Sequence, residues 1–171
     1  PATAEEREVL FEHERYDVDA LTYSRKRRCL LGAFCAGHRE PVRHYFDETA
    51  REQRARLEKH FPGRQIGLVD TDRDEVRCIV LVAGDRTRGA YYFYDRESDH
   101  MELLAEVAPW LPESEMVPMH PVTFTTRDGL LIEAYLSLPP GVELNAIDTP
   151  LPVIVNPHGG PWTRDDWGFS S

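Results

Sequence analysis

The sequence has 171 residues, enough for one ordinary domain or for parts of two. Its 41% hydrophobic and 29% charged residues are ordinary for a globular protein, and no apolar run approaches the roughly 20 residues that a membrane helix needs. The net charge of −10 argues against nucleic acid, because phosphate binding requires clustered lysine and arginine. We therefore expect no nucleic-acid partner and no membrane partner.

The first part of the chain alternates short apolar runs with polar turns, a pattern that predicts strands at residues 9–13, 18–23, 29–35 and 42–46. A helix is predicted from Glu48 to His60, with Asp47 or Thr49 as its cap and Pro62-Gly63 as its stop. Its sparse apolar positions predict a surface helix that buries one narrow face.

The strand pattern resumes after the helix. Turns rich in aspartate and glycine separate four further predicted strands, at residues 65–69, 76–83, 90–94 and 100–107. The three cysteines lack metal-ligand spacing, and Cys29 and Cys78 lie inside apolar runs, which predicts small buried side chains. We expect no metal site and no cofactor.

Two of these strand groups look like one unit used twice. Arg28-Cys29-Leu30 recurs as Arg77-Cys78-Ile79, and Tyr45-Phe46-Asp47 recurs as Phe93-Tyr94-Asp95, a period of about 50 residues. Such a period, with about four short antiparallel strands, is typical of a β-propeller blade. We predict a mostly β fold with two four-stranded blades, the helix replacing the outer part of the first. A plain β-meander is the alternative.

A linker and a hairpin are predicted next. Four prolines punctuate residues 109–121, which indicates a domain linker. Strands at 122–126 and 130–138 are predicted to form a hairpin around Asp128-Gly129. The domain prediction is blades at 1–111, a linker at 112–121, and the N-terminal strands of an α/β-hydrolase domain at 122–171.

The last stretch predicts a short strand that ends at a glycine-rich turn. Val153, Ile154 and Val155 are consecutive and β-branched, the pattern of a strand covered on both faces. The candidate site residues follow directly and are His158, Gly159, Gly160, Pro161 and Trp162. Glycines at the end of a strand let backbone N–H groups approach a ligand.

Three motifs in this order resemble the prolyl oligopeptidase family of serine peptidases, in its acylaminoacyl-peptidase and dipeptidyl-aminopeptidase branch. They are Val122-Thr-Phe-Thr-Thr-Arg-Asp-Gly129, Tyr135-Leu-Ser-Leu-Pro-Pro-Gly141 and His158-Gly-Gly-Pro-Trp162. The resemblance implies a β-propeller joined to a C-terminal α/β-hydrolase domain. It also implies a Ser-Asp-His triad, with the serine on a Gly-x-Ser-x-Gly elbow, that hydrolyses short peptides by acyl transfer.

The implied triad has no match within the chain. Ser137 lies inside a predicted strand, and Ser170 and Ser171 lack the elbow frame. We therefore expect the triad beyond Ser171 and an inactive isolated fragment. His158 precedes any nucleophile, so we expect it to hold the loop through a hydrogen bond rather than to act as the base.

The loop from His158 to Trp162 is expected to support the oxyanion site. We expect Trp162, Trp167 and Phe169 to pack it against the blades or the first helix of the hydrolase domain, with substrate contact as the alternative. The expected partners are a peptide substrate and, along the edge of strand 151–156, either the remainder of a longer chain or a second copy. Two other functions stay open: an esterase or amidase of α/β-hydrolase type, and a non-catalytic β-propeller binding module. The compartment is left open, with the cytoplasm favoured.

Overall fold

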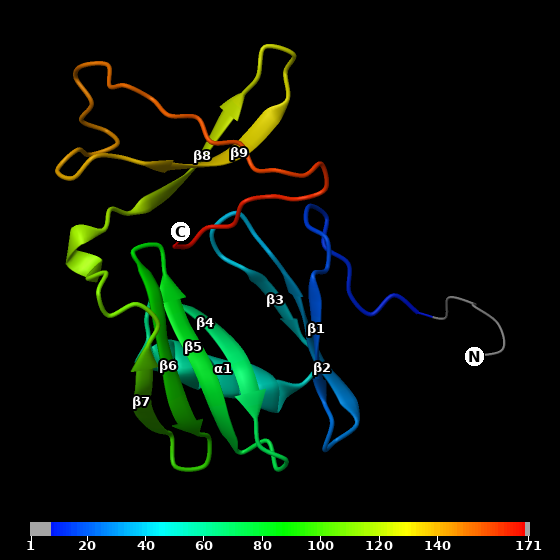
Figure 1. Ribbon diagram of the computed structural model, residues 1–171. Helices are drawn as coiled ribbons and strands as arrows, with labels where there is room; N and C mark the ends of the chain where they lie inside the picture. The colour runs from blue at the N-terminus through cyan, green and yellow to red at the C-terminus, as the bar shows by residue number, and fades with distance from the viewer. Residues whose placement is uncertain (1–7, 170–171) are drawn as a thin grey trace.

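The computed structural model of the protein describes residues 8–169, and its elements are mostly β (Figure 1). Nine strands form three separate antiparallel sheets within this range, and in each sheet the strands are neighbours in sequence. Ser170 and Ser171, considered above as candidate nucleophiles, lie outside the described residues. No helix in residues 8–169 is both long and apolar enough to cross a bilayer.

The first sheet has three strands: β1 (Ala20–Ser24), β2 (Cys29–Cys35) and β3 (Val42–Tyr45). The predicted strand at residues 9–13 is wrong, so this sheet lacks the fourth strand expected of it. The His13 ring accepts hydrogen bonds from the backbone N–H groups of Arg15 and Tyr16, at 3.2 and 3.1 Å. This side-chain bonding closes a local turn and competes with strand pairing.

The second sheet contains the four antiparallel strands predicted for it: β4 (Gln65–Thr71), β5 (Arg77–Gly84), β6 (Thr87–Asp95) and β7 (His100–Glu106). Alternate residues of β5 point into the core, which contains Leu57, Ile66, Cys78, Val80, Val82 and Tyr94. The burial expected for Cys78 is confirmed, whereas Cys29 is only half-buried. None of the sheets closes on itself, and the sheet-by-sheet arrangement fits both the blade and the meander interpretations.

Helix α1 (Glu48–His60) has the predicted bounds, and Asp47 is its cap. An Asp47 carboxylate oxygen accepts from the Ala50 backbone N–H at 2.8 Å. We expected this helix to replace the outer part of the first blade, but its buried side chain packs elsewhere. The helix lies against the second sheet in Figure 1 and contributes Leu57 to that sheet's core. Leu57 is the one buried position on this mostly polar helix.

Two polar contacts connect the first sheet to its neighbours. Ser24, only 1% exposed, donates its hydroxyl to Glu75 at 2.6 Å, which joins the β1–β2 turn to the β4–β5 turn. Arg27 donates two bonds to Asp47, at 2.7 and 2.9 Å, which join the same turn to the start of α1. The two halves of the apparent repeat are therefore held together by turn residues.

The ion pair between Arg27 and Asp47 predicts a pH-dependent contribution to stability. The hydrogen bond from Arg27, followed by that from the Ala50 backbone, lowers the pKa of Asp47 below its ordinary value. This contribution is present above the unfolded pKa of about 3.9 and is lost as pH falls through the lower folded pKa. Asp47→Asn keeps a good cap, so we expect it to cost about 0.5–1 kcal/mol of unfolding free energy at pH 7, and less at pH 3.

Urea unfolding at both pH values measures this difference. Asp148→Asn is the control, because Asp148 is exposed and has no hydrogen bond or ion pair within the described residues. A cost of Asp47→Asn that stays constant between pH 7 and pH 3 would contradict the assignment to the charged pair.

The third sheet is the predicted hairpin, β8 (Met119–Thr125) paired with β9 (Leu131–Ser137). A short 3₁₀ turn, η1 (Glu113–Glu115), lies in the proline-rich segment before it. The predicted buried strand at 151–156 is wrong: Val153, Ile154 and Val155 are 77%, 94% and 83% exposed and pair with no strand. The β8–β9 sheet ends at two strands, so this extended segment has no ladder to join in the described residues.

Candidate functional site

The candidate loop of residues 158–162 is exposed throughout. The His158 Nδ1 lies 2.7 Å from the Gly159 carbonyl oxygen, so this nitrogen carries the proton and donates. Gly160 has a φ of +145°, which glycine adopts readily and other residues rarely do. The loop is therefore a solvent-facing turn whose backbone N–H groups make no hydrogen bond within the described residues.

Trp162 does not pack against the sheets as predicted. Its side chain is 97% exposed, whereas Trp167, five residues later, is only 7% exposed. The sequence predicted the same packing for both. The structure separates them because the chain turns back onto the sheets only after Trp162, with Arg164 as the first residue bonded to them.

Arg164 and β9 both attach to the turn between β2 and β3. Arg164 Nη1 donates to the Ala36 carbonyl at 3.0 Å, and the Tyr135 hydroxyl donates to the His38 carbonyl at 2.5 Å. His38 Nε2 in turn lies 3.1 Å from the Ala134 carbonyl. Burial raises the pKa of the Tyr135 phenol, so it stays a neutral donor. Strand β9 and Arg164 are thus both attached to the β2–β3 turn, whereas residues 158–162 between them stay exposed.

The segment after Arg164 docks on the second sheet. Trp167 Nε1 donates to the Met119 carbonyl at 2.7 Å, and the Trp167 carbonyl accepts from Gln65 Nε2 at 2.6 Å. The Phe169 backbone N–H donates to the Gly84 carbonyl at 2.9 Å. Figure 1 shows this red segment running back from the hairpin toward the β2–β3 and β5–β6 turns. The predicted packing is confirmed for Trp167, and Phe169 is attached through its backbone.

Sequence patterns gave little sign of the residues that hold this segment. The Arg39 guanidinium carbon lies 5.3 Å from the Trp167 ring centroid. Gln65 is the first residue of β4, and the alternation of polar and apolar residues in that strand does not predict a contact with the C-terminal segment. Arg164 stands in a polar stretch that predicts only a loop. Within residues 8–169, no three His, Cys, Asp or Glu side chains gather in a way that would hold a metal ion.

These observations define a class: short antiparallel sheets, a proline-rich segment, and a hairpin followed by an exposed His-Gly-Gly loop and a tail that docks on the second sheet. No protein-family model matches the sequence. The chain is 31% identical over 126 residues to dipeptidyl aminopeptidase BIII of Pseudoxanthomonas mexicana, covering 72% of this chain and 18% of that protein. It is 25% identical over 183 aligned positions to dipeptidyl peptidase family member 6 of Caenorhabditis elegans, covering 97% of this chain and 25% of that protein.

The chain thus spans between about a fifth and a quarter of the length of the curated relatives it matches. Both relatives bear dipeptidyl peptidase names, and the similarity supports a relationship to a dipeptidyl peptidase-like group.

Proposed function

We propose that the chain is a section of a serine peptidase of the prolyl oligopeptidase type that hydrolyses dipeptidyl or aminoacyl substrates by acyl transfer. The observation that carries this proposal is the similarity to dipeptidyl aminopeptidase BIII, together with a His-Gly-Gly loop that follows a hairpin. On this proposal the first two sheets are blades of a propeller, and β8 and β9 begin an α/β-hydrolase domain. The Ser-Asp-His triad lies outside these 171 residues.

The loop of residues 158–162 forms the oxyanion-side wall of the site in this proposal. Gly159 and Gly160 are exposed and have no side chain, so a ligand can approach their backbone N–H groups closely. Donors placed in this way stabilise the tetrahedral oxyanion as charge develops on it. Loss of one such donor typically lowers kcat about 10²–10³-fold. His158 bonds its own loop through Nδ1, which supports a positioning role rather than that of the base.

The proposal is tested with the parent enzyme and dipeptidyl, N-acylaminoacyl and ester chromogenic substrates. We expect turnover of the dipeptidyl or aminoacyl amides, and inactivation when the serine of its Gly-x-Ser-x-Gly elbow is replaced with alanine. The 171-residue chain alone is expected to show no turnover. A parent protein without an elbow, or with ester hydrolysis alone, would overturn the peptidase proposal, and turnover by the 171-residue chain would overturn the placement of the triad.

Replacing Gly160 with alanine tests the role of the loop in the parent enzyme. A Cβ on Gly160 lies 3.0 Å from the Thr163 methyl group and requires a φ of +145°, so the turn must change shape. Because a shift of about 1 Å in a positioned group can cost 10²-fold, we expect kcat to fall about 10²-fold. Gly141→Ala is the control, since Gly141 also has positive φ but open space around it. Equal kcat values for the two variants would contradict the proposed role of the loop.

A further inference from the structure

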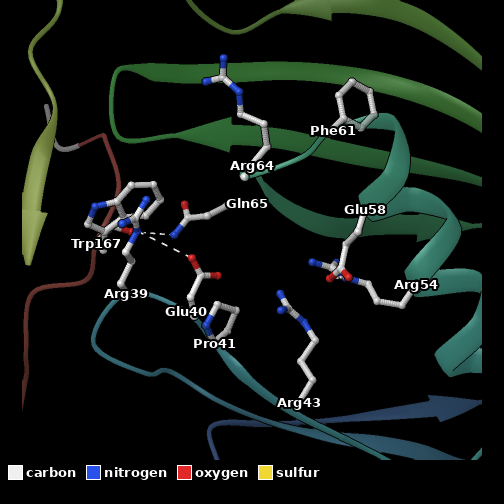
Figure 2. Close-up of a pocket in the computed structure, with 11 residues that line it drawn as sticks. Arg39, Glu40, Pro41, Arg43, Arg54, Glu58, Phe61, Arg64, Gln65 and Trp167 are labelled. Carbon is white, nitrogen blue, oxygen red and sulfur yellow. Dashed lines mark hydrogen bonds and ion pairs between the residues drawn. The ribbon is translucent and has the colours of Figure 1, made fainter.

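A cleft of about 340 Å³ opens between the first sheet, α1 and the docked Trp167 (Figure 2). Its lining contains none of the residues of the 158–162 loop. Four arginines and two glutamates supply its charges: Arg39, Arg43, Arg54, Arg64, Glu40 and Glu58. This excess of positive charge occurs in a chain whose net charge is −10, so the cleft is an electropositive spot on an acidic protein.

Three of the four guanidinium groups have partners. Arg54 donates to Glu58 at 2.7 Å and to the Ile66 carbonyl at 2.6 Å. Arg64 donates two bonds to Glu113, at 2.8 and 3.0 Å, and Figure 2 shows its side chain directed away from Arg43. Arg39 lies beside the Trp167 ring, with its Nε 3.7 Å from a Glu40 carboxylate oxygen.

Arg43 differs from these three. Its side chain enters the cleft from β3 in Figure 2, and no carboxylate within the described residues lies within ion-pair distance of it. Its guanidinium carbon is 5.5 Å from the Phe34 ring centroid, which leaves the N–H groups available. Burial, and then the neighbouring charge of Arg54, lower the pKa of Arg43. The opposing effect on this pKa comes from three nearby side chains: Tyr45, Glu58 and Glu40. A half-buried cation that makes no direct ion pair and lies beside a second cation is the arrangement that an anion stabilises.

We propose that this cleft binds a small oxyanion with two or more carboxylate or phosphate groups, held by the Arg43 guanidinium with Arg54 beside it. A guanidinium matches the planar oxygens of either group and can donate two parallel bonds. A second acidic group would reach toward Arg39 at the rim. The rings of Trp167 and Phe61 form the apolar walls, which limit the ligand to a compact molecule.

Binding would also stabilise the docked tail, because Trp167 forms one wall of the cleft. A ligand that binds only the docked state adds stability that rises with its concentration relative to its Kd. The proposal is independent of the peptidase function, since it concerns residues of the first sheet and α1, and it can stand if the catalytic assignment fails.

Titration calorimetry on the full 171-residue chain tests the proposal, with pyrophosphate and citrate as probes at constant ionic strength set with NaCl. We expect saturable one-site binding of at least one probe. The probe with the higher affinity shows whether the cleft prefers phosphate or carboxylate groups. Arg43→Gln should weaken binding at least tenfold and Arg43→Lys less. Arg73→Gln is the matched control, because Arg73 is exposed in the β4–β5 turn and has no described hydrogen bond or ion pair. It should leave the affinity unchanged.

Circular dichroism establishes that each variant is folded. If Arg43→Gln does not fold, Arg43→Lys decides, and an unchanged affinity in that variant overturns the assignment of Arg43. Absence of saturable binding of both probes to the unsubstituted chain also overturns the proposal. So does an equal loss of affinity in Arg43→Gln and Arg73→Gln, which would indicate a general charge effect.

Discussion

Replacing Gly89 with alanine is expected to cost about 4 kcal/mol of unfolding free energy or more. Gly89 has a φ of +91°, and a Cβ added there would lie 2.1 Å from the Val82 carbonyl oxygen and 2.8 Å from its carbon. The register of β5 and β6 shifts between Val82 and Gly84, so the backbone is already crowded at this bulge. The cost of a left-handed conformation and that of an overpacked backbone contact add up to an unusually large effect.

Gly63→Ala separates these two costs. Gly63 has a similar φ of +72°, but a Cβ added there meets nothing within 4 Å. Its substitution should therefore cost only about 1–2 kcal/mol, the conformational part. Urea unfolding of the two variants and the unsubstituted chain measures both values. Equal losses would show that the close approach of Gly89 to Val82 contributes nothing, which contradicts the packing of this bulge.

Local signals predicted the elements best where one short stretch of sequence decides the outcome. The bounds of α1 follow from the Asp47 cap and the Pro62-Gly63 stop, and the burial of Leu57 follows from its place on the helix's narrow apolar face. Strand β2 likewise has its predicted bounds, because a continuous apolar run lies between two polar turns.

Predictions failed where the outcome depends on a distant partner. Three β-branched residues at 153–155 favour a strand, but a strand needs a neighbour to pair with, and this segment pairs with none in residues 8–169. The strand expected at 9–13 failed for a different, local reason, because the His13 ring accepts two bonds from the backbone of the next few residues. In the proposed anion cleft, Arg43 and Arg54 stand in separate elements whose local sequence carries no sign that they share a cleft. Only the packing of α1 and the tail places them together.

Removing the Trp167 side chain is expected to release the C-terminal segment from the second sheet. Trp167→Ala loses the bond to the Met119 carbonyl and the burial of a ring that is only 7% exposed. Buried tryptophan truncations cost about 3–5 kcal/mol, so the docked segment should open far more often. Hydrogen exchange measures this directly, because the Phe169 N–H is bonded to the Gly84 carbonyl only while the segment is docked. We expect protection of that amide to be lost.

Trp162→Ala is the matched control, since the same truncation at a side chain that is 97% exposed removes almost no buried surface. It should leave the exchange of the Phe169 amide and the unfolding free energy unchanged, within about 0.5 kcal/mol. Trp167→Phe separates the two contributions further, because it keeps an aromatic wall and removes only the indole donor. If Trp162→Ala and Trp167→Ala expose the Phe169 amide equally, the tail is held by the whole loop rather than by Trp167, and the anion cleft loses the wall that this side chain provides.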